Sequence, residues 1–278
     1  YSLGLWGIFY TIGISLGFLI LGLGFASRMR GLNISTTAEI FETHYQSKVL
    51  KLFASALSII SLWGILVAQI IASKMIFLSL GFDDPYILAA FWGFVVFYTM
   101  IGGLGSVVII DTIQVIFILI IFTLLFLKAL PMSMAKLADA KLMMKMQGYY
   151  FSKKLILADL LPTLLMPTMF ALIEQDLAQR FFAAKTKATA TISAFLAAAM
   201  LIGFSLIPLF FGIYSKIKNI KIPIGADPLI PIIATIAGKT FLMLAICGII
   251  AAITSTADSL LSAISSNIVQ DFGTFLPM

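Results

Sequence analysis

One apolar stretch, near residues 240–269, carries side chains suited to binding an ion. At helical spacing its small and hydroxyl-bearing residues align on one face: Ala252, Ser255, Thr256, Ser259, Ala263 and Ser266. An adjacent stripe holds Thr254, Asp258, Ser262 and Ser265. In lipid, such a polar side must face protein or a water-filled site. Close helix packing explains small residues, but it does not explain Asp258 one turn from Ser255. A cation-binding face is therefore the favoured interpretation, and close packing is the alternative.

Two more polar side chains lie inside apolar segments. Asp111 sits one turn into the segment at about 106–130, where a carboxylate costs on the order of 3 kcal/mol unless it is paired or hydrated. We expect it either to have such a partner or to cap the start of its helix. Gln69 lies well inside the segment at about 50–80, so it should face the bundle and a polar ligand or partner.

The segment at about 158–177 contains Pro162 and Pro167, with Thr163 and Thr168 beside them. Each proline lacks a backbone N–H and frees a carbonyl, so we expect this helix to be bent or broken. Broken helices at membrane depth are tolerated where their backbone lines a cavity, as in transporters. A simple proline kink is the alternative.

These residues must be positioned by membrane helices. Of the 278 residues, 61% are hydrophobic and 11% are charged, which is too apolar for a soluble domain. We expect an all-α integral membrane protein with about seven spans, each near the roughly 20 residues that cross hydrocarbon. The predicted spans are 3–27, 50–80, 86–101, 106–130, 158–177, 188–214 and 240–269.

Short motifs mark the connections between the spans. The run Gly102–Gly105 should break the chain sharply, and Thr36/Thr37 with Glu39 indicates the start of a short amphipathic helix. A surface helix is expected within 131–157, and a short helix over 229–237. Gly13, Gly17 and Gly24 share a face of the first span, where we expect a neighbouring helix to pack closely.

The sequence offers no set of catalytic side chains. Ser259 has no histidine partner in reach, and the only histidine, His44, lies in a polar loop without a second ligand type nearby. We therefore expect no enzyme. The net charge of +6 is best explained by loops near anionic headgroups, and no nucleic acid is expected as a partner. Lys and Arg occur in loops on both sides, and their bias, which favours the 131–157 side as cytoplasmic, leaves orientation open.

Several motifs together resemble the sodium:solute symporter family. The stretch from Ala251 to Ser266, followed by Asp271, is similar to the family signature, a small-residue helix that ends in paired serines and an acid. Asp111-Thr112-Ile113-Gln114 after Gly102-Gly103 resembles another conserved segment of that family. Two loops also match: Thr37-Ala38-Glu39-Ile40-Phe41 and Glu174-Gln175 through Gln179-Arg180 to Ala183-Ala184-Lys185.

The resemblance implies a LeuT-type core, which has ten helices in two inverted five-helix repeats. The seven expected spans resemble core helices two to eight. On this basis residues 1–278 form a single, incomplete transporter domain without the first core helix and the last helices. Residues 28–50 would be cytoplasmic. We expect the protein in the bacterial inner (plasma) membrane, and nothing in the sequence indicates its oligomeric state.

The resemblance also implies particular ligands. The main sodium site would use the Ala252 carbonyl and the hydroxyls of Ser255 and Thr256, since hard cations prefer oxygen ligands. A second cation site would combine Asp111, Asp258 and Ser259, although Asp258 stands where such family members have a hydroxyl. The substrate would be lined by residues of two helices: Gln69, Pro162, Thr163, Pro167 and Thr168.

The expected function is sodium-coupled import of a small organic solute, such as a proline-like amino acid or a carboxylate. Sodium would be the coupling ion, with no organic cofactor, and the partners would be the solute and the lipid bilayer. Coupling to protons through Asp111 or Asp258 is a subsidiary hypothesis. Two alternatives stay open: a membrane sensor module of a symporter-fused signalling protein, and an inactive transporter fragment.

Overall fold

The computed structural model describes residues 7–137, 157–218, 220 and 229–273, and every regular element in these ranges is a helix. The elements are α1 (Ile8–Ile20), η2 (Leu21–Phe25), α2 (Ala26–Gly31), α3 (Glu39–Tyr45), α4 (Lys48–Ser79), α5 (Pro85–Leu137), α7 (Leu157–Ile173), α8 (Gln175–Phe182), α9 (Lys187–Ile217), α10 (Leu229–Ile236) and α11 (Lys239–Phe272). The predicted all-α class is confirmed.

Among the described residues, five helical segments are long and apolar enough to cross a membrane: Ile8–Gly31, Lys48–Ser79, Pro85–Pro131, Lys187–Ser215 and Lys239–Phe272. The predicted third and fourth spans lie within the one element α5, and the predicted fifth corresponds to α7, whose apolar part Leu160–Ile173 is shorter than a span. The sequence-based count of seven crossings stays a prediction.

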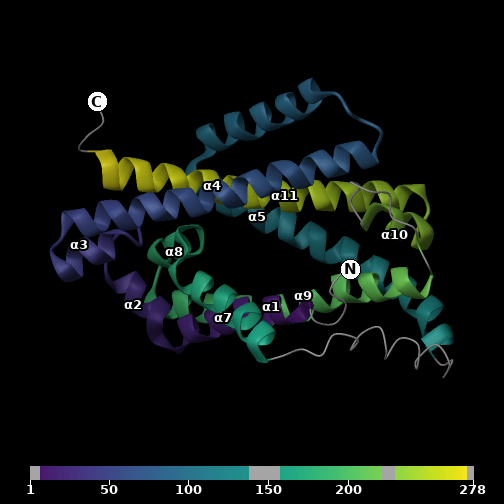
Figure 1. Cartoon of the computed structure of the whole chain (residues 1–278), viewed down its shortest axis with the longest axis horizontal. Coiled ribbons are helices and arrows are strands. Elements are labelled where there is room, and N and C mark those ends of the chain that lie inside the picture. Colours follow the sequence, from purple (N-terminus) through teal and green to yellow (C-terminus); the bar gives the residue numbers. More distant parts are fainter. Residues whose placement is uncertain (1–6, 138–156, 219, 221–228, 274–278) are drawn as a thin grey trace.

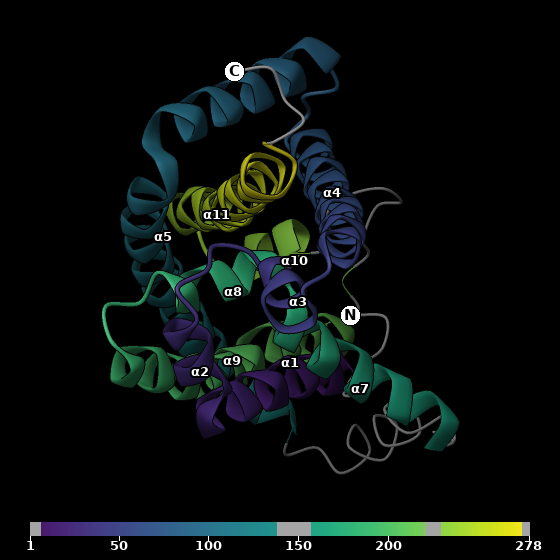
Figure 2. The ribbon, with the colours of Figure 1, turned by 90° about the vertical axis from the view of Figure 1, so that its left-hand side faces the viewer.

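The predicted break after residue 102 is confirmed at Gly103, where φ is 60° and ψ is 180°. This backbone conformation is essentially restricted to glycine, because a Cβ would collide with the peptide groups on either side. Figure 2 shows the result: the first part of α5 runs across one side of the molecule, and the helix then turns a sharp corner. The two parts of α5 therefore contact different neighbours.

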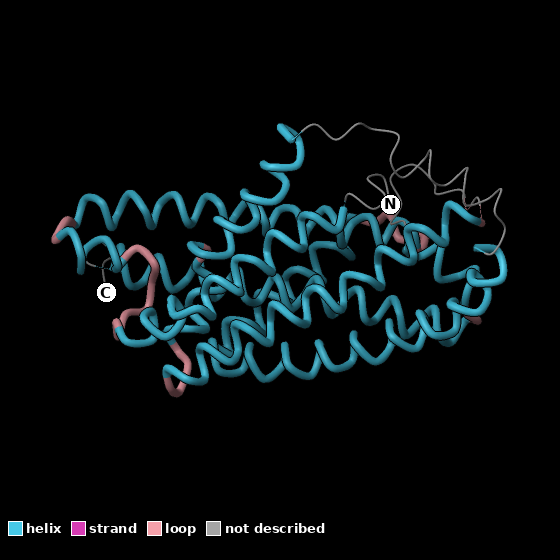
Figure 3. The backbone as a smooth tube through the Cα atoms, turned by 90° about the horizontal axis from the view of Figure 1, so that it is seen from below, coloured by secondary structure: helices cyan, strands magenta, loops and turns pink. Residues whose placement is uncertain are grey.

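Two groups of helices make up the molecule, and most of their axes run along its length (Figures 1 and 3). In the first group, α1 packs mainly against α7 and α9. A Cβ built on Gly13 would lie 2.5 Å from the Leu164 carbonyl oxygen, and one on Gly17 would lie 2.6 Å from the Ala171 Cβ. The predicted close packing at these two glycines is therefore confirmed.

Gly24 does not share this packing role. It has a φ of 131° inside η2, and an added Cβ would meet nothing within 4 Å. Its requirement for glycine comes from the backbone conformation, since positive φ strains residues with a Cβ. The expectation that Gly24 packs with Gly13 and Gly17 is thus wrong, because η2 departs from α-helical geometry and a constant 3.6-residue period no longer applies.

In the second group, α11 packs mainly against α5 and α4. One cluster of buried residues joins α4 to the C-terminal half of α11: Leu62, Leu260, Ala263 and Ile264. The short helix α8 contacts both groups, reaching α2 on one side and α11 on the other. In Figure 1 it lies between the helices of the two groups, near one end of the molecule.

The two short helices α3 and α10 confirm local predictions made from the sequence. The backbone N–H of Glu39 donates to Thr36 Oγ1 (3.2 Å), and Glu39 Oε2 accepts from the Ser35 N–H (2.9 Å), which together cap the start of α3. The short helix α10 forms as predicted over 229–236. The surface helix expected within 131–157 falls largely outside the described residues.

The outer surface is strongly apolar. Large hydrophobic side chains stand exposed on several long helices, including Trp63, Met100 and Ile192. Because patches of this kind mark interaction surfaces, and these helices have the length and composition of membrane spans, we assign the exposed apolar side chains to lipid.

Candidate functional site

The three predicted sodium ligands lie together on α11. The hydroxyls of Ser255 and Thr256 both donate to the Ala252 carbonyl oxygen, at 3.1 Å and 3.0 Å. Ser255 and Thr256 are half-buried, and Ala252 is exposed, so this face is accessible. Hydroxyl groups in membrane helices commonly bond back to a carbonyl one turn earlier. Each hydroxyl oxygen retains lone pairs for a further ligand.

A second cluster forms around Asp111 in the later part of α5. Arg180 of α8 donates from Nη2 to Asp111 Oδ2 at 2.7 Å, and the same nitrogen contacts Ser259 Oγ. The Ser259 hydroxyl also donates to Asp111 Oδ2 at 3.3 Å. Asp111 is buried and lies well past the corner at Gly103, so it does not cap a helix start. Its carboxylate is instead paired, which is how a membrane-buried acid is stabilised.

Asp258 has partners of its own. It is fully buried, and its two carboxylate oxygens accept hydrogen bonds from Tyr98 Oη and Thr99 Oγ1, each at 2.6 Å. Both partners belong to the part of α5 before Gly103. Among the described residues, Asp258 and Asp111 share no hydrogen-bond partner. The structure thus joins Asp111 to Ser259 and gives Asp258 different hydrogen-bond partners, and a site made of all three stays a prediction.

Three polar residues that the sequence did not single out as ligands contact α11 in this region: Gln114, Gln179 and Arg180. Gln114 Nε2 donates to Thr254 Oγ1 (3.1 Å), and Gln179 Nε2 donates to the Ser259 carbonyl (3.4 Å). The other side-chain oxygens, Asp111 Oδ1, Gln114 Oε1 and Gln179 Oε1, are buried without a hydrogen-bond partner among the described residues. Buried acceptors are normally satisfied, so each of these oxygens is a candidate contact for an ion or a water.

A sequence signal for these residues did exist. Gln114 lies three positions after Asp111, which places both on one helix face. Arg180 was visible only as part of a loop motif, since nothing in its local sequence links it to a carboxylate 69 positions earlier.

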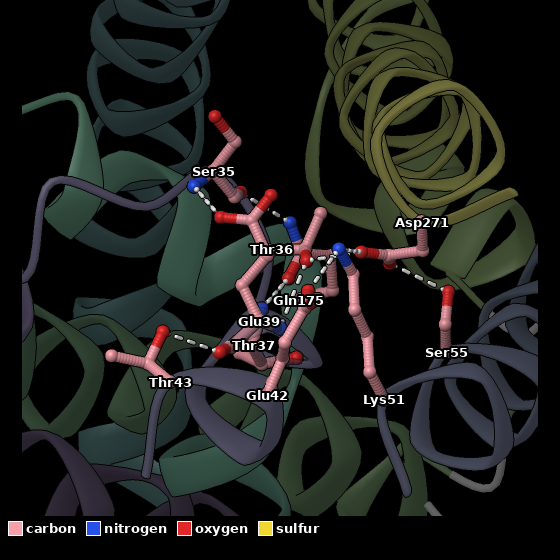
Figure 4. A network of polar contacts seen from close by, with 10 residues as sticks. All are labelled: Ser35, Thr36, Thr37, Glu39, Glu42, Thr43, Lys51, Ser55, Gln175 and Asp271. Carbon is pink, nitrogen blue, oxygen red and sulfur yellow. Dashed lines mark hydrogen bonds and ion pairs between the residues drawn. The ribbon is translucent and has the colours of Figure 1, made fainter. Parts of the chain in front are cut away.

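A third polar network joins α11 to the chain around α3 (Figure 4). The Asp271 carboxylate is buried near the end of α11, where it accepts from Thr36 Oγ1 (2.9 Å) and Ser55 Oγ (2.7 Å). Lys51 Nζ lies 3.7 Å from Asp271 Oδ1 and 2.8 Å from Glu42 Oε2. The hydrogen bond from Lys51 holds the pKa of Glu42 below its ordinary value.

Gln175, at the start of α8, holds the same loop from the other side. Its Oε1 accepts from the Thr37 N–H (2.7 Å), and its Nε2 donates to the Ser35 carbonyl (3.0 Å). Gln175 is fully buried. The loop before α3 is therefore attached both to α11 through Asp271 and to α8 through Gln175.

The predicted substrate-lining residues differ in how deeply the structure buries them. Pro167 and Thr168 are buried against α1: Thr168 Oγ1 donates to the Gly13 carbonyl at 2.9 Å, and Pro167 Cγ would lie 2.5 Å from a Cβ at Gly13. These two residues take part in helix packing against α1, and their predicted role in lining a solute stays a prediction. Gln69 is half-buried in α4, Thr163 is half-buried in α7, and Pro162 is exposed.

The expected break in the fifth span occurs away from its prolines. Helix α7 runs through both Pro162 and Pro167 and ends at Ile173. The interruption lies at Glu174, whose ψ of 129° is extended, before α8 begins at Gln175. Glu174 is buried, and its Oε1 has no hydrogen-bond partner among the described residues. The prolines alone do not end the helix, because α7 packs tightly on α1 on both sides of Pro167.

Comparison with known proteins identifies the family to which this chain belongs. A model of the sodium:solute symporter family matches residues 1–276. The chain belongs to the sodium:solute symporter family. No curated protein and no solved structure matches the chain.

Family membership indicates sodium-coupled solute transport and implies sodium as the coupling ion. The family match agrees with the long apolar helices of the chain, and together they indicate an integral membrane protein. The solute is not identified by the match. Among the described residues, no group of three or more His, Cys, Asp or Glu side chains could hold a metal ion. A sodium site made of carbonyl and hydroxyl oxygens needs no such group.

Proposed function

We propose that α11 supplies the main sodium ligands of a symporter that imports a small organic solute, such as an amino acid or a carboxylate. One observation carries the proposal: the Ser255 and Thr256 hydroxyls converge on the Ala252 carbonyl, on a face that neighbouring helices leave accessible. Neutral oxygens suit sodium because they bind a hard cation and still let it leave.

The second predicted cation position differs in its electrostatics. Asp111 is already paired with the Arg180 guanidinium, so a sodium ion there would meet a cation 2.7 Å from the same carboxylate oxygen. We infer that Arg180 supplies the positive charge at this position in the described conformation. A second sodium ion would have to displace it, and the unpartnered oxygens of Asp111, Gln114 and Gln179 are the groups that the ion would use.

Transport would need the two helix groups to move relative to each other. The loop before α3, held by Asp271 and Gln175, is a described connection between α11 and α8. We propose that this network keeps one end of the molecule closed. If sodium and solute both favour the same conformation, each raises the affinity of the protein for the other by one coupling factor. Gln69 remains the predicted contact for the solute.

The test is binding of radioactive sodium to the purified protein, together with uptake of labelled amino acids and short carboxylates into proteoliposomes. We expect Thr256→Ala to weaken sodium binding at least ten-fold and Thr256→Ser to retain most of it, because serine keeps the oxygen ligand. Thr112→Ala is the matched control, since the exposed Thr112 makes the same kind of intrahelical bond, to Val108 at 2.7 Å.

Equal sodium affinity in Thr256→Ala and Thr112→Ala would contradict the ligand assignment. Sodium binding without uptake of any solute in the panel would contradict import and favour the sensor alternative. Absence of both activities in a folded protein would favour the inactive fragment.

A further inference from the structure

A cationic pocket opens where α2 ends and α9 begins. It has a volume of about 310 Å³ and is lined by Arg30, Gly31, Asn33, Lys185, Thr186 and Lys187. Three of these six residues carry a positive charge, and none is acidic. Salt bridges among the described residues involve only Lys51 and Arg180 as cations, so the pocket cations have no carboxylate partner there. The pocket therefore has an unbalanced positive charge.

The pocket is built by specific contacts. Arg30 is held by two hydrogen bonds: its Nε donates to the Ala184 carbonyl, and its Nη1 donates to Asn33 Oδ1 at 3.2 Å. A guanidinium has five N–H donors, so others are left for a ligand. Gly31 lets Lys187 approach, because a Cβ on this residue would lie 3.1 Å from Lys187 Cε and 3.4 Å from its Nζ. Lys187 is thus placed against Gly31, the residue that follows Arg30, and both cations line the pocket.

The start of α9 adds to the positive field. The Thr189 N–H donates to Thr186 Oγ1 at 3.1 Å, which caps a helix that continues to Ile217. The N-terminal end of a long helix carries a partial positive charge, which supports anion binding next to the three side chains.

The position of the pocket suggests the source of the anion. Arg30 is the penultimate residue of the apolar segment Ile8–Gly31, and Lys187 is the first residue of the segment Lys187–Ser215. Two candidate spans therefore end at the pocket, and the ends of membrane spans are where headgroup phosphates are met. The same helices expose large apolar side chains further along, Leu23 at 77% and Ile192 at 65%, which suit acyl chains.

We propose that this pocket binds a phosphate group, and that the phosphate is that of an anionic phospholipid headgroup. Arginine matches two phosphate oxygens with paired donors, and the two lysines supply further charge. This site is separate from the ion ligands on α11, and the proposal does not depend on transport.

The experiment is native mass spectrometry of the purified full chain titrated with phosphatidylglycerol or with phosphatidylcholine. We expect tighter binding of phosphatidylglycerol. Removing each pocket lysine should weaken it roughly five-fold, so Lys185→Gln with Lys187→Gln should weaken it by roughly 25-fold. The side chains of these lysines make no hydrogen bond to the described residues, so the variant keeps the folding contacts that Arg30→Gln would remove. Lys48→Gln is the matched control, since Lys48 is likewise the exposed first residue of a spanning helix.

A second variant, Gly31→Ala, keeps every charge but crowds Lys187, and it should also weaken phosphatidylglycerol binding. Equal affinity for the two lipids, or equal binding in the double-lysine variant and in Lys48→Gln, would overturn the proposal. The same proteins are titrated with inorganic phosphate in lipid-free detergent. Saturable binding of inorganic phosphate that prevents phosphatidylglycerol from binding would overturn the lipid assignment. Phosphate binding that is too weak to compete with phosphatidylglycerol supports it.

Discussion

At the scale of single residues, two buried acids on neighbouring helices need partners to offset their charge. Asp111 and Asp258 are both removed from water, and each receives hydrogen bonds from a different set of side chains. Asp111 has a full counter-charge in Arg180, whereas the described partners of Asp258 are neutral hydroxyls. The two acids therefore respond differently to substitution, because only the first depends on an ion pair.

Replacing Arg180 by Gln should destabilise the protein, since it leaves Asp111 buried without its counter-charge. We expect a loss of roughly 1–3 kcal/mol in the free energy of unfolding, below the value for a wholly buried pair because the Arg180 side chain is 39% exposed. Thermal unfolding in detergent measures the effect. Adding Asp111→Asn to Arg180→Gln should restore most of the loss, and a double variant as unstable as Arg180→Gln alone would show that charge pairing is not the cause.

At the scale of elements, the corner at Gly103 decides which surfaces α5 presents. The part before the corner brings Tyr98 and Thr99 to Asp258, and the part after it brings Asp111 to Ser259. A straight α5 could not pack both parts against α11 in this way. The glycine is therefore required by the local backbone conformation and not by the packing of other elements, because a Cβ there would meet no atom of a neighbouring element within 4 Å.

Gly103→Ala should cost on the order of 1–3 kcal/mol of stability, because alanine is strained where φ is 60° and ψ is 180°. Gly105→Ala is the matched control: it lies two residues away in the helix, also with open space around it, and alanine favours helix there. Gly103→Ala should lower the denaturation midpoint, whereas Gly105→Ala should raise it or lower it by clearly less. A Gly103→Ala midpoint equal to that of Gly105→Ala would mean that the corner tolerates a side chain.

At the scale of the whole molecule, the network around Asp271 joins elements that are far apart in the chain. It brings together the end of α11, the start of α4 and the loop before α3, while Gln175 adds α8. The Glu42–Lys51 pair extends it to the surface. Because the folded-state pKa of Glu42 is lowered, the contribution of this pair is present above the ordinary pKa of glutamate and is lost as the pH falls through the lowered value.

Asp271→Asn should loosen this end of the molecule, since the amide keeps an acceptor oxygen but loses the charge that faces Lys51. We expect faster hydrogen–deuterium exchange in residues 32–45, measured by mass spectrometry on the reconstituted protein. Asp84→Asn is the control, because Asp84 is an exposed acid at the start of α5 and asparagine can keep its bond to the Tyr86 N–H. Unchanged exchange in 32–45 would rule out the network as the closing contact.

The sequence by itself determined the features that depend on neighbouring residues. Composition predicted an all-helical membrane protein, Gly102–Gly103 predicted the corner, and Thr36 with Glu39 predicted the start of α3. The gathering of Ala252, Ser255 and Thr256 also followed from helical spacing alone. These features rest on backbone preferences and periodicity, which act over a few residues and can be recognised without knowing the fold.

Only the tertiary structure decided which distant groups meet. Arg180 pairs with Asp111, the loop before α3 is held by Asp271 and Gln175, and Pro167 lies against Gly13. Arg30 and Lys187 likewise line one pocket, although 156 residues lie between them in the sequence. The physical reason is that charge pairing and close packing depend on distance in space, and that distance is set by how the two groups of helices pack together.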